Sequence, residues 1–207
     1  MTLDELRADP ESYSGETVAY REKQLHVIPD LPVVNRQEFI LTRVKGKVVL
    51  DIGASGPMHE AIVGVSAKCY GIDRPNPTEV RILQEKDMGV TGIDLDKETG
   101  WVPKFGGVEL IVCGEVIEHL GNPQSFLQRL RAVYKDVPVI ITVPNAFSTG
   151  GVNSLNRGIE NVNSDHVAYY SYTTLTRLVT RVGYKVCEAY WYNGQPKFAE
   201  GLIFVVR

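Results

Sequence analysis

The segment 48–57 constrains the fold of this chain more than any other. It opens with a short apolar run, Val48–Leu50, passes through a turn that holds Gly53 and Gly56, and reaches Pro57. A run of this kind is typical of a buried parallel strand, and proline fits the first position of a helix. Glycine lets the turn adopt a positive φ angle and brings its backbone close to a ligand. The segment therefore predicts a buried strand, a ligand-facing turn and a helix.

Short apolar runs of the same kind recur along the chain, with helical segments between most of them. Further strands are expected at Lys68–Ile72, Leu110–Cys113, Val137–Val143, Val186–Tyr192 and Leu202–Val206, and helices at Asn35–Val44, Pro57–Ser66, Pro123–Tyr134 and Thr173–Val182. Alternating strands and helices predict an α/β fold with a mostly parallel sheet covered on both faces. The last two strands are too close in sequence for a crossover helix, so they should pair antiparallel at a sheet edge.

The length and the first part of the chain indicate how it is organised. At 207 residues, one domain is expected rather than two. Residues 1–33 are polar, and prolines and a glycine break any regular period there. We expect a short helix and an extended arm in this part. The arm should lie on a single domain formed by residues 34–207.

Composition bears on location and partners. No stretch approaches the roughly 18 apolar residues of a membrane helix, and the first residues lack the pattern of a secretory signal. The 3 cysteines are widely spaced and match neither a disulfide framework nor a zinc motif, so we expect a reducing, cytoplasmic location. Lys and Arg number 22 against 25 Asp and Glu, a net charge of −3 without a basic run. This balance favours a small-molecule partner over nucleic acid.

An acid stands where a nucleoside would need it. Asp73 follows Asp51 by roughly 20 residues, at the end of the next expected strand, where a carboxylate accepts both hydroxyls of a ribose. A tight turn without a ligand is the alternative, but strand, glycine turn, helix and spaced acid together favour a nucleoside. Ser55 and Pro57 stand where a dinucleotide site would have further glycines, and no P-loop lysine follows. A ligand without a pyrophosphate therefore fits better.

The same residues resemble a known family, the class I S-adenosylmethionine-dependent methyltransferases. Val49–Gly56 is similar to their first motif, and Asp73 matches their ribose-binding acid. Gly92–Leu95 resembles the third motif, whose acid or following residue touches the adenine. The segment 110–120 is similar to the fourth motif of the ubiquinone-biosynthesis-like branch (methyltransferase-11/23 type), which Ile141–Asn145 and the later Asp165-His166 pair also fit.

The resemblance covers about residue 34 to the end and carries several expectations. It implies a doubly wound, mostly parallel seven-stranded sheet with a reversed C-terminal edge hairpin, the Rossmann-like methyltransferase fold. It implies S-adenosylmethionine as the cofactor. The residues expected to bind this cofactor are Asp51, Gly53, Ala54, Ser55, Gly56, Asp73, Asp94, Leu95, Gly114 and Glu115.

A Glu-x-x-Glu-His cluster follows the strand at 110–113. If Glu115 opens a helix, then Glu115, Glu118 and His119 lie on one face of it. They could cap loops and pack, or His119 could act as a general base toward a hydroxyl or amine. A third interpretation adds His166 and makes the four residues ligands of a divalent metal, magnesium or manganese. The catalytic candidates are His119, Glu118 and His166. Ubiquinone-type O-methyltransferases and small-RNA 2′-O-methyltransferases carry a similar cluster, whereas many other relatives keep Glu-His without a metal.

The segment 144–168 has no clear period and is too long for an ordinary connection. We interpret it as a substrate lid that carries Asn145, Arg157 and His166, with a mobile surface loop as the alternative. Among the remaining aromatic and imidazole side chains, Tyr169, Tyr170 and Tyr172 are expected in the core, whereas His26 and His59 are expected to be solvated or to contact the arm.

The leading hypothesis is a methyltransferase that moves a methyl group to oxygen or nitrogen of a small molecule. A metal-dependent RNA ribose 2′-O-methyltransferase is the alternative within the family. An NAD oxidoreductase and a non-catalytic nucleoside-binding relative are the alternatives outside it.

Overall fold

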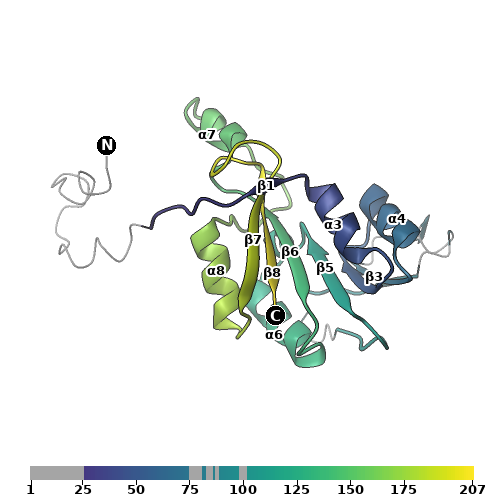
Figure 1. The fold of residues 1–207 in the computed structure, drawn as a ribbon. Helices are drawn as coiled ribbons and strands as arrows, with labels where there is room; N and C mark the ends of the chain where they lie inside the picture. The colour runs from purple at the N-terminus through teal and green to yellow at the C-terminus, as the bar shows by residue number, and fades with distance from the viewer. Residues whose placement is uncertain (1–25, 75–80, 83–85, 87–88, 98–101) are drawn as a thin grey trace.

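The computed structural model describes residues 26–74, 81–82, 86, 89–97 and 102–207. The strands in this part form one eight-stranded sheet in the order β1-β7-β8-β6-β5-β2-β3-β4 (Figure 1). The strands are β1 Val33–Val34, β2 Val48–Ile52, β3 Lys68–Asp73, β4 Val90–Gly92, β5 Leu110–Gly114, β6 Val139–Pro144, β7 Val186–Tyr192 and β8 Gly201–Val206. The helices are α3 Arg36–Val44, α4 Gly56–Val65, the 3-10 helix η1 Ile117–His119, α6 Pro123–Val133, α7 Thr149–Leu155 and α8 Tyr172–Arg181.

The doubly wound, mostly parallel sheet is confirmed. Every neighbouring pair is parallel except the two that involve β8, which runs antiparallel to both β6 and β7. The sheet has eight strands rather than seven because Val33 and Val34 pair in parallel with Trp191 and Tyr192. The β7–β8 hairpin therefore does not form the outermost edge. Strand β1 has only two residues, so the sequence shows no alternating pattern that would predict it. The helix expected in the arm lies outside the described residues.

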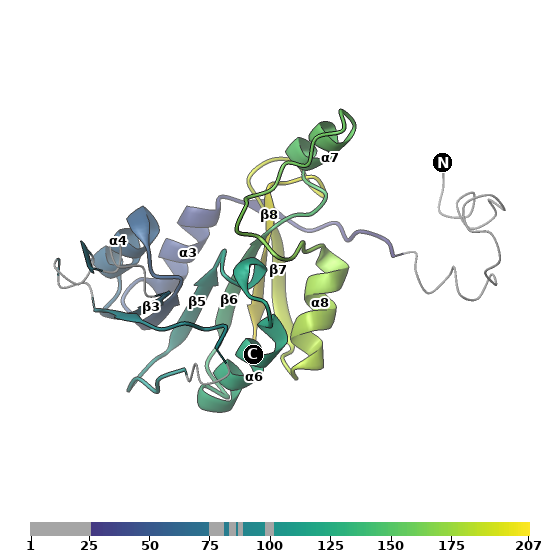
Figure 2. The same cartoon turned by 180° about the vertical axis from the view of Figure 1, so that it is seen from behind.

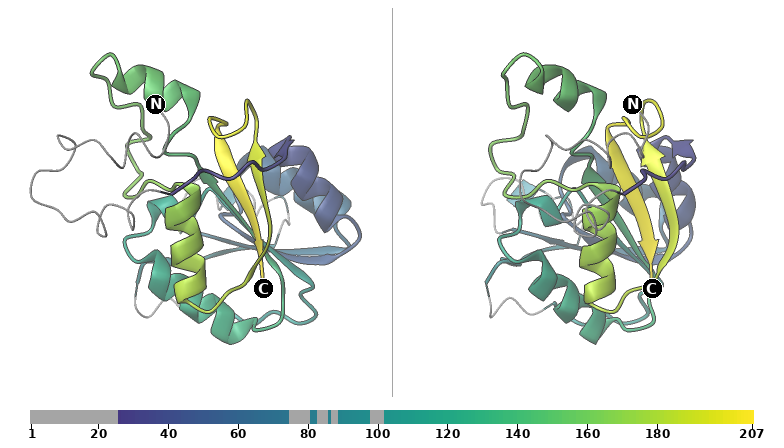
Figure 3. Two further views of the ribbon diagram at one scale, coloured as in Figure 1. Left: turned by 60° about the vertical axis from the view of Figure 1, so that its left-hand side comes forward. Right: turned by 90° about the vertical axis from the view of Figure 1, so that its left-hand side faces the viewer.

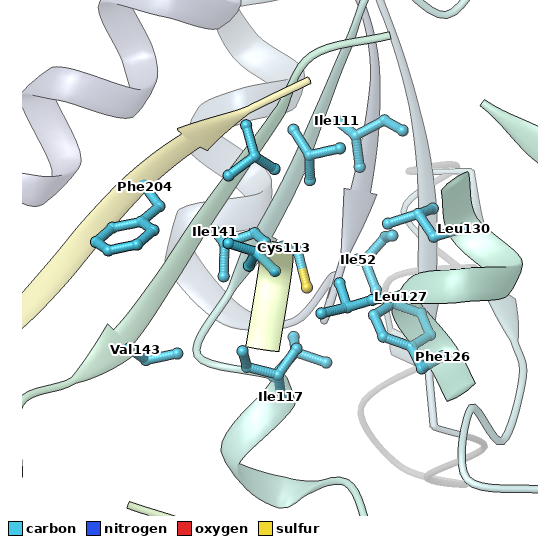
Figure 4. Packing of buried hydrophobic residues seen from close by; sticks show 14 of the residues in the cluster. Ile52, Ile111, Cys113, Ile117, Phe126, Leu127, Leu130, Ile141, Val143 and Phe204 are labelled. Carbon is cyan, nitrogen blue, oxygen red and sulfur yellow. The ribbon is translucent and has the colours of Figure 1, made fainter. Parts of the chain in front are cut away.

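The helices cover both faces of the sheet (Figures 1 and 2). On one face, α3 and α4 pack on a cluster that includes Val49, Val112 and Ile203. On the other, α6 and α8 pack on the larger cluster that Figure 4 shows, which includes Phe126 of α6 and Ile52 of β2. Alternate residues of one strand serve the two clusters, as a sheet buried on both sides requires.

Each of the helices expected within residues 34–207 forms, with its ends set by local chemistry. The Oδ1 atom of Asn35 accepts from the N–H of Glu38 at 3.0 Å and begins α3. Asn122 caps α6 in the same way, before Pro123. Gly183, with φ +89°, follows the C-cap of α8, which is the left-handed position that glycine favours at a helix end.

The segment 144–168 contains a helix that the sequence pattern did not predict. In α7, the Ser148 hydroxyl accepts from the N–H of Gly151 at 3.2 Å and begins the helix. The seven residues of α7 include no buried one, so no apolar period marks it. Figure 3 shows α7 projecting away from the sheet. None of the described helices is both long enough and apolar enough to cross a bilayer.

Candidate active site

A cavity of about 310 Å³, here called the first cavity, lies at the carboxyl ends of β2, β3 and β5. The chain runs from β2 outward to β3 and β4, and then crosses to β5 and β6 on the other side. Ligands of doubly wound sheets bind where the strand order reverses in this way. Of the residues expected to bind the cofactor, the lining includes Asp51, Gly53, Ser55, Asp73, Leu95, Gly114 and Glu115. It does not include Ala54, Gly56 or Asp94.

The glycine turn after β2 is shaped by backbone geometry and by crowding. Gly53 has φ +80°, and a Cβ atom there would overlap the side chain of Val116. A side chain at this position is therefore excluded for two independent reasons. The N–H groups of Gly53 and Ala54 both donate to the carbonyl of Ile72, at 2.8 and 3.0 Å. These bonds fix the turn against the end of β3.

The carboxylate of Asp73 lies at the end of β3 and faces the first cavity. It accepts a hydrogen bond of 2.6 Å from the N–H of Arg74. Burial raises the pKa of this carboxyl, and the bond to Arg74 and a hydrogen bond from Ser55 partly oppose the shift. A half-buried acceptor beside the glycine turn is the arrangement that the sequence predicted for a ribose.

The residues that follow β4 enter the site through Leu95 rather than Asp94. Leu95 is 4% exposed and lines the first cavity. The carboxylate of Asp94 instead accepts from the N–H of Asp96 at 3.1 Å and lies 3.4 Å from Lys97. After β4, the first cavity is therefore lined by an apolar side chain, that of Leu95, and not by a carboxylate.

Asp51, which lines the first cavity, forms a buried pair with His59. The Nδ1 atom of His59 lies 2.8 Å from Oδ2 of Asp51, and the His59 side chain has no exposed surface. Burial raises the pKa of Asp51, and the bond to His59 opposes the rise. The expectation that His59 is solvated or contacts the arm was wrong, because a histidine in the second turn of α4 faces the strand that precedes the helix.

Glu115 does not open a helix, because its φ angle is +56° and only the single turn η1 follows. Its carboxylate lies among residues of α3, β6 and β7. There it accepts from Thr142 Oγ1 at 2.8 Å and from the Tyr192 hydroxyl at 3.1 Å, and it lies 3.1 Å from the guanidinium of Arg36. Arg36 also lines the first cavity. Sequence reasoning missed Arg36, since only its place directly after the Asn35 cap marks it.

A second group of side chains meets beside the first cavity. Ligand atoms of Glu118, His119 and His166 all lie within 4.8 Å of one another, and the two imidazole rings meet edge to face with centroids 4.6 Å apart. His119 lines the first cavity. The Glu118 main-chain carbonyl accepts from the N–H groups of Val167 and Ala168 at 2.8 and 3.2 Å, which holds His166 in place. The distant histidine expected at this site is therefore brought to it, whereas Glu115 is not part of the group.

Glu118 is the unusual member of this group. It is 1% exposed, and neither carboxylate oxygen has a hydrogen-bond partner within the described part of the chain. Burial, followed by the charge of Glu115, raises the pKa of Glu118 to about 8. Burial and the neighbouring His119 lower the pKa of His166. A buried carboxylate without partners is costly unless a proton, a donor or a cation occupies the space beside it.

The fold and this arrangement agree with what the comparison of the chain with protein families shows. A family model described as "Methyltransferase domain" matches residues 25–189, which is most of the chain. The chain belongs to this family.

A curated relative refines the placement of this methyltransferase domain. The ubiquinone biosynthesis O-methyltransferase of Histophilus somni (strain 2336) is 34% identical over 115 residues, which are 48% of this chain and 47% of that protein. The chain spans about half the length of the curated relatives it matches. Together with the family match, these relatives confirm the resemblance to class I S-adenosylmethionine-dependent methyltransferases of the ubiquinone-biosynthesis-like branch.

Solved structures share the fold of the methyltransferase domain. The small RNA methyltransferase HEN1 aligns with a TM-score of 0.64 at 17% identity, over 83% of this chain and 24% of that one. The magnesium protoporphyrin IX methyltransferase of Synechocystis PCC 6803, solved with bound SAH, aligns with a TM-score of 0.59 at 14% identity, over 82% and 80%. At these identities the likeness establishes the architecture.

Other expected lid residues of the methyltransferase domain have different surroundings. Asn145 is 5% exposed, and its amide donates to the carbonyls of Lys197 and Ala199, both at 3.1 Å, so it fastens two loops together. Arg157 is exposed just after α7. A second cavity of about 300 Å³ lies under α7 and includes His166 in its lining.

The three tyrosines expected in the core differ from one another. Tyr170 is buried, and the ring of Tyr172 meets that of Phe204 edge to face. The expectation was wrong for Tyr169, which is 52% exposed and lines the second cavity. Its hydroxyl donates to Glu160 at 2.9 Å. Tyr169 therefore belongs to the surface beside α7.

Proposed function

We propose that this methyltransferase domain transfers a methyl group from S-adenosylmethionine to an oxygen atom of a small molecule. Oxygen and nitrogen were both expected as acceptors, and the name of the curated relatives, ubiquinone biosynthesis O-methyltransferase, favours oxygen. The observation that carries the proposal is the unpartnered carboxylate of Glu118, which lies with two imidazoles beside the first cavity. A hydroxyl that enters this group meets both a hydrogen-bond acceptor and a base.

The first cavity offers groups that match the parts of S-adenosylmethionine. Asp73 provides an acceptor for the ribose hydroxyls, Leu95 an apolar surface for the adenine, and Arg36 a cation for the carboxylate of the methionine end. The bare backbone at Gly53 gives close approach at the turn. When bound, the cofactor supplies a methyl group on a positively charged sulfur, which is the electrophile of the reaction.

The residues of the second group move the proton. His119 or His166 accepts the proton from the acceptor hydroxyl as oxygen attacks the methyl carbon, since a neutral imidazole has a nitrogen that can take up a proton. Glu118 lies beside this imidazole, and the positive charge that forms there favours the ionised carboxylate, which in turn stabilises the imidazolium. The main contribution of the chain is to hold the oxygen and the methyl donor in line.

Glu118, His119 and His166 also fit a divalent metal, magnesium or manganese. One buried carboxylate with two unpartnered oxygens and two imidazoles form a compact donor set. When bound, such an ion lowers the pKa of an acceptor hydroxyl. This set has three protein ligands instead of the four expected from the sequence, because Glu115 is held by Arg36, Thr142 and Tyr192.

Two measurements test the proposed function. Calorimetric titration with S-adenosylhomocysteine should show binding, and a parallel titration with NAD should not; the reverse result overturns the proposal. Labelled S-adenosylmethionine is then offered with hydroxylated small molecules, amines and an RNA oligonucleotide that has free 2′-hydroxyls. Methyl transfer to a small hydroxyl supports the proposal, and transfer only to RNA or to an amine overturns it. A cytoplasmic location stays a prediction.

The metal is tested with the same assay. If an ion is bound, a chelator should abolish methyl transfer, and added magnesium or manganese should restore it. Full activity in the chelator identifies the imidazoles alone as the base. No transfer under any metal condition, with cofactor binding intact, identifies a non-catalytic nucleoside-binding domain.

A further inference from the structure

A third cavity lies at the same edge of the sheet and has no part in the proposed chemistry. It has a volume of about 570 Å³ and lies between the start of α8, the arm near His26 and the loop at Lys197, with Trp191 of β7 also in its lining. We call it the α8 cavity. It shares Asn145 and Phe147 with the second cavity, which contains His166.

The charge of the α8 cavity is positive. Among the described residues, its lining includes Arg177 and Lys197 and no carboxylate, in a chain whose net charge is −3. Within the described residues, neither cation forms an ion pair, and the guanidinium of Arg177 instead lies 2.8 Å from Nε2 of His26. Arg177 and Lys197 thus have no carboxylate partner among the described residues, although the chain is acidic. Such cations favour an anionic ligand.

The start of α8 adds hydrogen-bond donors to the cavity. The side chains of Ser171 and Thr174 form a capping box that uses the N–H groups of these two residues. The first two amides of the ten-residue helix, those of Tyr172 and Thr173, precede any bond within the helix. Tyr172 and Thr173 both line the cavity. Such amides, with the helix dipole behind them, bind anionic oxygens.

Trp191 provides an independent sign of a ligand. The residue is 1% exposed and lines the α8 cavity, and its indole N–H is buried without an acceptor in the described part of the chain. An indole N–H can only donate, and leaving a buried donor unpaired costs about 1–3 kcal/mol. This unpaired donor belongs to a residue that borders the cavity, and an acceptor oxygen is the partner that it lacks.

We propose that the α8 cavity binds a carboxylate or phosphate group carried by the methyl acceptor. This inference rests on the proposed function, because it takes the reacting hydroxyl to lie at His119 and His166. A short stretch of chain connects the histidines with the α8 cavity. Val167 and Ala168 donate to the Glu118 carbonyl, and the helix α8 begins at Tyr172, four residues after Ala168. The acceptor of this proposal places its hydroxyl at His119 and His166 and its anionic group at Arg177 and Lys197.

The experiment follows the indole N–H signal of Trp191 by NMR in the full ¹⁵N-labelled chain. The chain has 2 tryptophans, so a W101F variant identifies the signal. Inorganic phosphate and acetate are titrated separately at constant ionic strength, and the anion that shifts the signal to saturation identifies the group. R177Q and K197Q should each weaken this binding by about tenfold, as loss of a charge-assisted hydrogen bond predicts. R181Q, on the same helix but outside the cavity lining, should leave the binding unchanged.

The outcomes separate this inference from the proposed function. An indole signal that neither anion moves, in a chain that still binds S-adenosylhomocysteine, overturns the anion site alone. Equal anion binding by R177Q, K197Q and R181Q overturns it as well, since the cations would then have no role. Loss of S-adenosylhomocysteine binding overturns the proposed function and leaves the anion titration as an independent result.

Discussion

The guanidinium of Arg36 lies 3.1 Å from the carboxylate of Glu115, so the start of α3 meets the end of β5 beside the first cavity. The Arg36 guanidinium carbon also lies 5.5 Å from the centre of the Tyr192 ring, and the Tyr192 hydroxyl donates to the same carboxylate at 3.1 Å. Both members of the ion pair are 28% exposed. Arg36 is thereby held where a ligand carboxylate can reach it.

Replacing Arg36 should weaken cofactor binding. R36Q removes one of the two arginines that line the first cavity, and Glu115 keeps its bonds from Thr142 and Tyr192, so the fold should persist. We expect the affinity for S-adenosylhomocysteine to fall by about tenfold, which is about 1.4 kcal/mol. Titration calorimetry measures this, with R43Q on the same helix as the control. Equal affinities of R36Q and the unmodified chain would contradict the role.

Replacing Asp73 should have a larger effect. In D73N the side chain keeps its shape but loses the charge that accepts hydrogen bonds from the ribose hydroxyls. We expect the dissociation constant for S-adenosylhomocysteine to rise by about 10- to 100-fold, in line with the loss of one or two charged hydrogen bonds. D136N, an exposed position near the start of β6, is the matched control. If both variants bind equally well, the ribose assignment fails.

The metal assignment has a direct test that needs no acceptor. Manganese is titrated into the metal-free chain and followed by electron paramagnetic resonance. E118Q should bind manganese more weakly by more than about a hundredfold, because the buried carboxylate is the one anionic group of this donor set. E60Q, on the exposed side of α4, serves as the control. Undiminished binding by E118Q would place the ion elsewhere.

The buried Asp51–His59 pair should matter for stability. H59L leaves the Asp51 carboxylate buried without the imidazole 2.8 Å away, and we expect the free energy of unfolding to fall by about 3 kcal/mol. Urea denaturation measures the change. The same substitution at the exposed His26 should cost less than about 0.5 kcal/mol. A similar small loss for H59L would show that the pair is unimportant for folding.

The Arg43–Glu188 pair predicts a pH dependence of stability. The two side chains form bonds of 2.8 and 2.7 Å, and the bond to Arg43 lowers the pKa of Glu188 from 4.5 to about 2. Because the folded-state pKa is the lower one, the stabilisation is complete above pH 4.5 and is lost as the pH falls toward 2.

The measurement compares E188Q with the unmodified chain. Both side chains are about a third exposed, so solvent screening limits the difference in unfolding free energy near neutral pH to about 1 kcal/mol. This difference should shrink steadily in denaturation experiments below pH 4.5. A difference that stays constant from neutral pH to about pH 3 would show that the ionised pair does not stabilise the fold.

Features set by local pattern were predictable from the sequence. The buried strands show as apolar runs, and Asn35 and Gly183 mark the ends of helices because capping depends on neighbouring residues. Strand β1 and helix α7 left no such trace. The first is two residues long and depends on pairing with β7, and the second buries no side chain.

The same distinction separates the site residues that could be predicted from those that could not. Gly53 and Asp73 were predictable because they stand at strand ends, which a doubly wound sheet gathers at one edge. Arg36 was not, since its position depends on how α3 packs. The separation of Glu115 from Glu118 follows from one backbone angle, the positive φ of Glu115, which residue spacing does not reveal.

The short strand β1 connects the first cavity with the α8 cavity. Val33 and Val34 pair with Trp191 and Tyr192, and Arg36 follows two residues later. Trp191 lines the α8 cavity, and the Tyr192 hydroxyl bonds to Glu115. If Val33 and Val34 detached from β7, Arg36 would lose its position and Trp191 would become exposed at the same time. Affinity for the methyl donor and for its acceptor would decline together, although every contact residue remained unaltered.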